Sequence, residues 1–553
     1  MPRGLTQNLI LSAVVFLSLD VTSGAAAPPY NYLIPEPPSV PEQIGAPSPQ
    51  PPQRYAPSPA GLVQPLPVVN GNLPQLPFQA PQPTEEDRPL PINLPTALYL
   101  SNARPLVIAF AQASVEEAAA RLQGAKVLWL PNLSFGADYY RHDGYDQTTN
   151  GTIITDDKNA YYAGGGATLD FAVTDAIFRP LAARQELAAR QADLQAARND
   201  ALLAVAIAYF DVQESRGRLA AAIDSANKAN DLVSRIKGLA KDLVPAIEID
   251  RALALQYDLQ QQVAAEQGNW RVASSRLNRV LRLNPSSVVI PMEPPQLQVT
   301  LIDPGAVVDQ LVAIGARYRP ELASQRDLAR LSQERVKQEQ FRPIVPTLLV
   351  GGRGPYGSLN GGVFGGGPDG GVNTSGGRLD MDVAAVWTLN NLGAGNRALV
   401  RERQAQEQQA WINFYNTQDQ VAQEVVQARA QLVAAAKQID EAAAGLQEAL
   451  TMFAGNLTGI SQTRTAGELL ILVNRPQEAV AALQQLSRSY YNYLAAVNGY
   501  NRAQFQLYRA VGYPARDVIC DRPLGEVLKV DLSRPPQLAP VCPNVLSNPC
   551  PCK

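Results

Sequence analysis

The sequence has little of what most catalytic sites are built from. Its 553 residues include a single histidine, His142, and only four cysteines. Histidine is the commonest acid–base and metal-binding side chain, so we expect no enzyme activity, no metal and no cofactor. The cysteines all lie close to the C-terminus: Cys520, Cys542, Cys550 and Cys552. The body of the chain must therefore fold without disulfides or thiolate metal sites.

The net charge is small, and long apolar runs are also scarce. The 47 Lys and Arg residues nearly balance the 50 Asp and Glu residues, so nothing attracts nucleic acid. One apolar run, residues 9–17, follows Arg3 and precedes small residues at 23–27, which is typical of a signal peptide over residues 1–27. A short membrane anchor is the alternative, but a spanning helix needs about 20 apolar residues. If the rest of the chain enters a membrane, it must do so with strands.

Proline and glycine are concentrated in particular segments. Twenty of the 45 prolines lie in residues 28–92, a segment that we predict to be disordered because it has few large apolar side chains. Residues 514–553 form a second tail, whose cysteines could make two disulfides or a thiolate metal site. The 39 glycines are densest over residues 351–377, where we expect a flexible loop.

Between the tails the chain is duplicated, with one copy in residues 93–300 and the other in residues 301–513. A helical stretch runs from Pro105 to Pro131, and another runs from Pro320 to Pro346. The two intervals between prolines are equal in length. Prolines are tolerated at helix starts and just beyond helix ends, so this matched spacing indicates an internal repeat.

Each second proline is followed by segments in which apolar and polar residues alternate. Leu133, Phe135 and Tyr139 alternate with small or polar residues, and Val383 and Trp387 belong to a similar segment in the second copy. This period of two predicts two β-hairpins, residues 132–173 and 346–389, and so four strands per chain. Their length suits tilted membrane strands. Hairpins packed on helices in a soluble domain are the alternative.

The remaining segments predict long helical hairpins over residues 180–283 and 396–511. Both are rich in Ala, Leu, Gln and Arg with three/four spacing of apolar residues, as in coiled coils. We expect Pro245 to start the first returning helix, residues 454–459 to form the second turn, and Pro476 to kink the last helix. Helices this long exceed a compact domain, and four strands cannot close a membrane barrel. If the strands lie in a membrane, other subunits must therefore complete the barrel, and three copies would supply twelve strands.

Short features follow one another in a fixed order between residues 93 and 513. They are Pro131, Leu169-Asp170-Phe171, Ala208-Tyr209-Phe210-Asp211-Val212, Pro346, Trp387-Thr388-Leu389 and Tyr490-Tyr491-Asn492-Tyr493-Leu494. In these features the sequence resembles the TolC-like outer-membrane efflux protein family.

The resemblance implies a homotrimer in which a twelve-stranded barrel continues into an α-helical tunnel, set in outer-membrane lipid and extending into the periplasm. It also implies a passive exit duct for efflux or type I secretion, docked by a periplasmic adaptor and an inner-membrane RND or ABC transporter. A non-conducting periplasmic coiled-coil scaffold is the alternative.

Four aspartates on the polar face of the strands are the predicted lining of the lumen. In a trimer each would become a ring of three carboxylates, and rings of one sign bias ion selectivity, here toward cations. Ordinary solvation of these positions is the alternative. Tyr139, Phe171 and Trp387 are predicted to be interfacial aromatics or to pack where strands meet helices. The four aspartates are Asp138, Asp170, Asp380 and Asp382.

The helix tips are the predicted site of the gate and of adaptor contact. The resemblance implies polar links between subunits at that end, for which the acidic candidates are Asp242, Glu248 and Glu468. Short apolar residues at the tips suit packing of one helix tip against another. The candidates for that contact are Leu243, Val244, Pro245, Gly455, Asn456 and Leu457.

Overall fold

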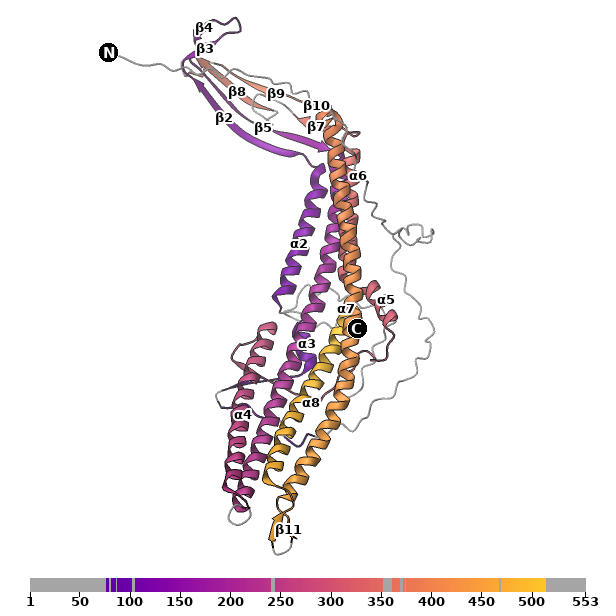
Figure 1. Ribbon diagram of the computed structural model, residues 1–553. Helices are drawn as coiled ribbons and strands as arrows, with labels where there is room; N and C mark the ends of the chain where they lie inside the picture. Colours follow the sequence, from indigo (N-terminus) through magenta and orange to yellow (C-terminus); the bar gives the residue numbers. More distant parts are fainter. Residues whose placement is uncertain are drawn as a thin grey trace, which may run out of the picture. The chain divides into compact units, whose positions relative to one another are not determined.

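A computed structural model (Figure 1) describes residues 76–78, 81–85, 87–101, 105–239, 244–351, 361–368, 371–372, 374–466 and 469–513. The predicted signal peptide, most of the proline-rich segment and the tail from residue 514 lie outside these residues, as do Asp242, Leu243 and Glu468. The described part is mostly helical with a smaller set of strands, as predicted. None of its helices combines the length and apolar character needed to cross a membrane.

The described elements occur twice in the same order: short helices, strands, then two long helices. The longest helices of the two copies have 67 and 66 residues, and their partners have 36 and 35. The first copy contains α1 (Leu94–Ser101), α2 (Leu106–Lys126), the 3-10 helix η1 (Val127–Trp129), β2 (Asn132–His142), β5 (Lys158–Ala172), α3 (Val173–Leu239) and α4 (Ala246–Leu281). The second contains α5 (Val308–Tyr318), α6 (Pro320–Phe341), β7 (Thr347–Gly351), β8 (Gly361–Pro368), β9 (Thr374–Leu379), β10 (Asp382–Val386), η2 (Asn390–Gly393), α7 (Ala394–Gly459) and α8 (Pro476–Ala510).

The long helices form a row. Helices α2 and α4 both pack on α3, α3 packs on α6 and α8, and these two pack on α7. Figure 1 shows α2 beyond the end of α4, so the row runs α2/α4, α3, α6/α8, α7. Small residues such as Ala189, Ala222 and Ala479 are fully buried in its seams, which lets the helix axes approach closely. The two edges of the row are α7 and the α2/α4 pair.

Six of the strands form one antiparallel sheet beyond the upper ends of the helices (Figure 1). β2 pairs with β5 along its whole length, and β5 pairs on its other side with β8 and β7 in turn. β9 and β10 pair with β8 and β7. The sheet therefore has four strand positions, with β2 at one edge and β9 with β10 at the other. Two smaller hairpins lie apart from it: β3 (Tyr145–Gln147) with β4 (Ile153–Thr155), and β11 (Thr463–Ala466) with β12 (Leu469–Leu472).

The prediction of a simple loop over the glycine-rich residues 351–377 is wrong. β8 and most of β9 lie in this segment, and β8 runs beside the glycines of β5. The backbones approach so closely there that a Cβ on Gly362 would lie 2.3 Å from the Ala163 carbonyl oxygen. Glycine is needed for this approach because any side chain would clash. The alternation that identifies strands cannot be seen in a run of glycines.

Three predicted helix boundaries also need correction. α3 begins at Val173, before Pro180; Asp175 in its first turn suits the positive end of the helix dipole and also accepts hydrogen bonds from Gln338 and Arg342 at the end of α6. Pro476 is the first residue of α8 and causes no kink, since a helix start needs no N–H there. Residues 454–459 continue α7, because Phe453 is still buried against the next helix.

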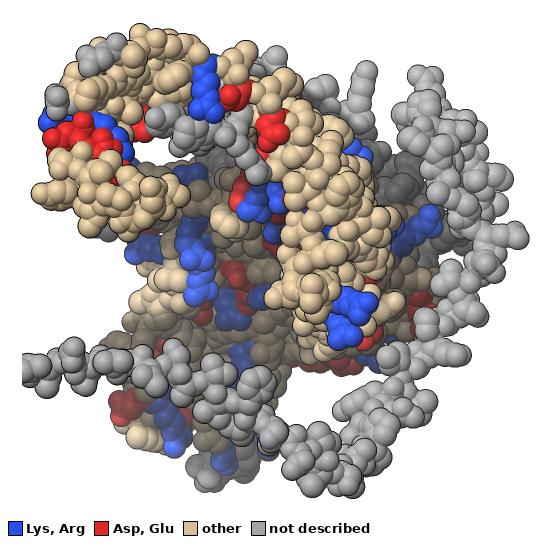
Figure 2. Space-filling model, turned by 90° about the horizontal axis from the view of Figure 1, so that it is seen from above, with Lys and Arg blue, Asp and Glu red and all other residues tan. Residues whose placement is uncertain are grey.

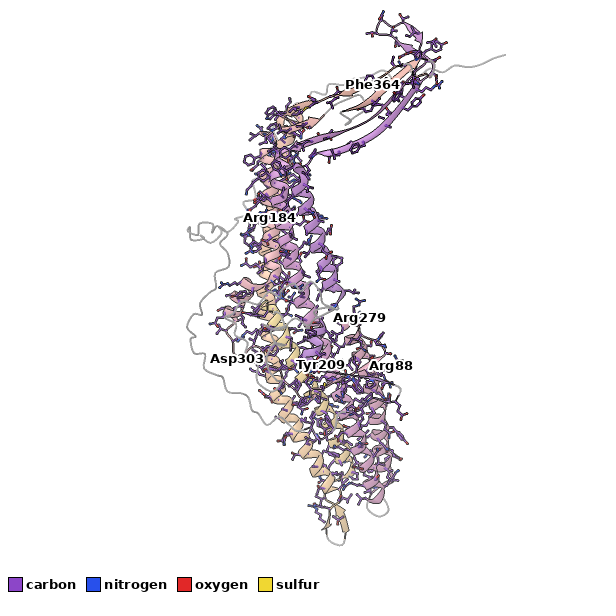
Figure 3. The ribbon with its side chains drawn as sticks, turned by 180° about the vertical axis from the view of Figure 1, so that it is seen from behind. Arg88, Arg184, Tyr209, Arg279, Asp303 and Phe364 are labelled. Carbon is purple, nitrogen blue, oxygen red and sulfur yellow. The ribbon has the colours of Figure 1, made fainter. Side chains whose placement is uncertain are left out.

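A belt of short elements packs on the middle of the row. It consists of β1 (Arg88–Ile92), α1, β6 (Ser287–Pro291), residues 292–307 and α5, and β1 pairs with β6 in parallel. The Tyr209 hydroxyl of α3 donates to the Glu293 carboxylate, which also accepts the Leu94 N–H at 2.9 Å. In Figure 3, Tyr209 lies at the level of Arg88 and far from Arg184. β1 falls within the segment predicted to be disordered, so that prediction is wrong for residues 88–92.

An ion pair anchors the start of β1 to α4. Arg271 donates to the nearly buried Asp87 carboxylate at 3.0 Å, and the Thr84 hydroxyl donates to it at 2.7 Å. Burial alone would raise the pKa of Asp87, but the hydrogen bonds from Thr84 and Arg271 lower it below 3.8 overall. The stabilisation is therefore present above that ordinary value and is lost as the pH falls through the lower folded-state pKa.

We predict that Asp87→Asn loosens β1. Loss of a charge-assisted hydrogen bond costs about 1–2 kcal/mol, so the Leu90 and Ile92 amides should exchange with solvent deuterium at least about fivefold faster. Mass spectrometry of peptides from the purified protein measures this. Arg88→Gln, at an exposed neighbouring position, should leave the exchange rate unchanged, and equal rates in all three proteins would contradict the anchoring role.

Candidate functional site

The belt covers one face of the helical row. On α8, the side-chain oxygens of Asn501 and Gln504 accept the Val299 and Leu301 backbone N–H groups at 2.8 and 3.0 Å. On α3, Arg216 donates to the Pro291 carbonyl at 2.7 Å. These contacts pair belt backbone groups that would otherwise be buried without partners. The opposite face of the row is called the open face below.

The open face carries charged side chains at regular intervals. Asp200 and Tyr209 are nine residues, two and a half turns, apart, so Asp200 lies opposite the belt. A seven-residue repeat stays on one side of a coiled helix. Seen from above in Figure 2, basic and acidic side chains are interspersed and do not form a patch of one sign. The charged residues that follow this repeat on the open face include Arg179, Glu186, Asp193, Asp200 and Glu214 of α3, with Arg488, Arg502 and Arg509 of α8.

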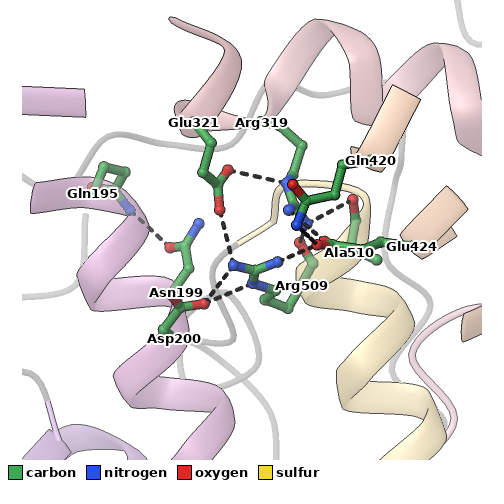
Figure 4. A network of polar contacts seen from close by, with 9 residues as sticks. All are labelled: Gln195, Asn199, Asp200, Arg319, Glu321, Gln420, Glu424, Arg509 and Ala510. Carbon is green, nitrogen blue, oxygen red and sulfur yellow. Dashed lines mark hydrogen bonds and ion pairs between the residues drawn. The ribbon is translucent and has the colours of Figure 1, made fainter. Parts of the chain in front are cut away.

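A polar network joins the four helices where α6 stacks above α8 (Figure 4). Arg509 of α8 pairs with Asp200 of α3 at 2.7 Å and with Glu321 of α6 and Glu424 of α7, both at 2.9 Å. The Arg319 side chain is 3% exposed and pairs with Glu424 at 2.6 Å and Glu321 at 3.0 Å. Burial lowers the pKa of Arg509, but the three carboxylates outweigh it and raise the pKa overall. Arg509 therefore stays charged, and the two arginines together hold the helices in register.

A second polar cluster lies further down the seam between α3 and α8. The Asn498 amide donates to Asp211 at 3.1 Å and also to Glu214, and Arg502 pairs with Asp211 at 3.3 Å. Arg218 stacks 5.6 Å above the Tyr491 ring. Burial raises the pKa of Tyr491 to about 12, so its hydroxyl stays neutral. These contacts make the seam polar on the open face.

The strand register places three of the four predicted lumen aspartates on one face of the sheet. Asp138 is opposite Tyr162 of β5, and Asp170 lies eight residues further along β5 and so on the same face. Asp170 is opposite Leu349 of β7. Asp382 of β10 is opposite the residue two positions further along β7, so it also lies on this face. The other face carries exposed apolar side chains, including Leu133, Phe135, Tyr139, Leu379 and Val383.

Asp380 differs from the other three aspartates. It lies between β9 and β10, and its carboxylate pairs with Arg378 at 2.5 Å. Its charge is therefore largely compensated, which the strand pattern could not show.

Two of the predicted interfacial aromatics lie where strands meet helices, but only Phe171 packs there, because Trp387 is as exposed as Tyr139. Phe171 is buried against Trp129, with ring centroids 4.4 Å apart. Trp387 follows the end of β10 and donates to the Ile344 carbonyl at 3.2 Å. Tyr139 remains 59% exposed on the apolar face, as an interfacial residue would be.

The described tip candidates lie near the lower ends of the long helices. Glu248 is 9% exposed and pairs within α4 with Arg251, which also reaches Gln477 of α8 at 3.4 Å. Val244 is buried and Pro245 precedes α4. Gly455, Asn456 and Leu457 belong to the last turns of α7, and the Asn474 amide donates to Asn456 at 3.1 Å.

Sequence reasoning missed the belt contacts and the network of Figure 4. The signal in the sequence was the group of polar residues Asn498, Asn501 and Gln504 in α8, which the structure shows to be buried. Such side chains are buried only with partners. Those partners lie far away along the chain. Among the described residues, no cluster of three or more His, Cys, Asp and Glu side chains is arranged to hold a metal ion.

Comparison with solved structures finds the same arrangement in outer-membrane channels. A membrane protein from Pseudomonas aeruginosa aligns with a TM-score of 0.62 at 15% identity, covering 76% of this chain and 92% of the other. The Campylobacter jejuni CmeC outer membrane channel aligns at 0.60 and 16% identity, covering 76% and 85%. The open state of the Neisseria gonorrhoeae MtrE outer membrane channel aligns at 0.60 and 15% identity, covering 79% and 94%. No family model and no curated protein sequence matches this chain.

These alignments span most of each channel, and they establish that the chain has the fold of outer-membrane channels.

We predict that Arg509→Gln destabilises the protein more than Arg502→Gln. The first change leaves three carboxylates facing each other with only Arg319 between them, whereas Arg502 is 41% exposed and has one carboxylate partner. Breaking a partly buried network should cost about 2–3 kcal/mol, and an exposed pair costs less than about 1 kcal/mol. The thermal unfolding midpoint in detergent checks this order, and equal midpoints would refute it.

Proposed function

We propose that the chain is one subunit of an outer-membrane duct that serves as the passive exit of an efflux or type I secretion system. The observation that carries the proposal is that the sheet and the helical row are both open at two edges. β2 and α2 form one edge, and β9, β10 and α7 form the other. A head-to-tail contact between copies would pair both layers at once and close a ring.

The exposed apolar patches on the two edges support this contact. One patch on α2 contains Leu106, Val107 and Phe110, and the other on α7 contains Ile412 and Tyr415, all at least half exposed. The stretch of α2 between Phe110 and its upper end is nearly as long as the stretch of α7 between its start and Ile412. At the rise of an α-helix both patches lie about 25 Å below the strands, so each would meet the other across a subunit boundary.

The two faces of the sheet fit a duct in lipid. In a closed ring the apolar face with Phe135 and Leu379 would face acyl chains, and the face with Asp138, Asp170 and Asp382 would face water. Three copies of four strands would give the twelve-stranded barrel expected from the family resemblance. The open face of the helices would then line a tunnel into the periplasm, and Asp138, Asp170 and Asp382 would favour cations.

Partners follow from the same proposal. An adaptor and an RND or ABC transporter would engage the helix tips, where Val244, Pro245, Gly455, Asn456 and Leu457 are the contact candidates, with Leu243 beside them in sequence. Glu248, together with Asp242 and Glu468, is the gate candidate. No catalytic residue or cofactor enters this function. A non-conducting scaffold would need neither an apolar outer sheet face nor a charged inner one.

We predict that Phe110→Cys combined with Ile412→Cys links subunits. A short bismaleimide should convert the double variant into covalent dimers and trimers on a denaturing gel, because the two patches meet between copies. Sedimentation of the purified protein should give three subunits.

The matched control joins Phe110→Cys with Arg184→Cys. Arg184 is two residues before Glu186, about 200° around α3, and so lies on the belt-side face. This pair, and each single variant with its tail cysteines intact, should stay unlinked by the reagent. A monomer that does not conduct in a planar bilayer would favour the scaffold.

We predict that changing Asp138, Asp170 and Asp382 together to Asn lowers the ratio of potassium to chloride permeability. Each substitution removes a ring of three negative charges from the proposed lumen. Reversal potentials across a planar bilayer with a salt gradient measure this ratio. Changing Asp380 to Asn and Arg378 to Gln together should change it much less, because the pair that is removed carries no net charge. Unchanged selectivity in the triple variant would reject the lumen assignment.

A further inference from the structure

A groove on the open face lies between the network of Figure 4 and the strands. Its volume is about 380 Å³, which is within the range of sites for small organic ligands. All four upper helices contribute to it, so it bridges the whole row. The lining residues include Arg179 and Ala183 of α3, Arg335 of α6, Arg342 just after α6, Arg403 of α7 and Ala125 of α2.

Two of the groove's four arginines are already neutralised. Arg179 pairs with Asp175 at 2.9 Å, and Arg342 pairs with Asp175 and Glu339, both at 2.8 Å. The acidic lining residue Glu186 is held by Arg121 of α2 at 2.6 Å. The carboxylates in and around the groove are therefore engaged.

Arg335 and Arg403 supply the remaining positive charge. Among the residues that the structure describes, Arg335 has no ion pair, and the nearest carboxylate to Arg403 is that of the exposed Glu402 at 3.9 Å. These guanidinium groups come from different helices and line the same groove. A planar guanidinium can donate two parallel hydrogen bonds to a carboxylate, sulfonate or phosphate. The groove surface is apolar at Ala125 of α2 and at Ala182 and Ala183 of α3.

We propose that this groove binds amphiphilic organic anions, which are compact solutes that join one acidic group to an apolar body. Arg335 and Arg403 hold the anionic group, and the three alanines contact the apolar body. The inference rests on the proposed duct, because a closed ring turns the open face into the wall of the tunnel. A solute that enters from the helix tips then meets the groove before it reaches the aspartates of the strands.

Calorimetric titration of the purified full-length protein in detergent tests the proposal. The probes are 1-naphthalenesulfonate and 1-naphthylmethylammonium, which share a ring system and carry opposite charges. We expect saturable binding of the sulfonate and at least tenfold weaker binding of the ammonium ion. The double variant Arg335→Gln, Arg403→Gln should weaken sulfonate binding at least tenfold. Because neither arginine balances a buried carboxylate, the variant should keep the subunit number and unfolding midpoint of the unmodified protein.

Arg184→Gln is the matched control, since it removes one arginine from the opposite face of α3 and should leave binding unchanged. The groove proposal would be overturned if the double variant bound the sulfonate as tightly as the unmodified protein does. Equal affinity of the unmodified protein for the two probes would overturn it as well. The outcome separates this inference from the duct. A protein that conducts but does not bind the sulfonate disproves the groove alone, whereas one that binds it through Arg335 and Arg403 without conducting disproves the duct alone.

Discussion

The structure depends on one constraint, which is that backbone groups at a sheet edge must find partners. β2 on one side and β9 with β10 on the other leave N–H and C=O groups unpaired in a single copy. In hydrocarbon each such group costs several kcal/mol. The helical row beneath the sheet is also open at its two edges, α2 and α7, where aromatic and aliphatic side chains are exposed. In the proposed ring, one rotation that repeats the subunit would satisfy both layers, so the sheet and the helices share one explanation.

In the proposed ring, the belt decides which face of the row is outside. Its backbone groups are satisfied by polar side chains of α3 and α8, such as Gln504, which bonds to Leu301 and Ile302. A helical row without it would be nearly symmetric, with polar residues on both faces. Because the belt occupies one face, the charges of Asp200, Asp211 and Arg509 are left on the other. The network around Arg319 joins the upper helix α6 to the lower helix α8. It lies at the level where α3 and α7 pass from contact with α6 to contact with α8.

The likeness to solved channels at 14–16% identity indicates how few residue identities this architecture needs. Small residues every three or four positions suffice for helices that pack along their length, and alternation of apolar with small or polar residues suffices for the strands. Specific side chains matter at the junctions, where Trp129 packs on Phe171 and Asp175 binds Arg342. Charged positions such as Arg335 and Arg403 on the open face are not needed for either packing pattern, which makes them suited to setting solute preference.

Local periodicity was enough to determine the duplication, the long helices and the strands β2, β5 and β10, because each is a repeat of 3.5 or two residues that neighbours in sequence define. The tertiary structure alone decided that the glycine-rich segment forms strands, since glycines pair there by close backbone approach to β5. It also decided that residues 88–92 form β1, that α7 passes through Gly455, and that Asp380 is neutralised by Arg378. The groove with Arg335 and Arg403 was likewise decided by the tertiary structure alone. Its residues come from helices in both copies of the repeat, and no local pattern relates them, because their proximity follows from how the two copies pack.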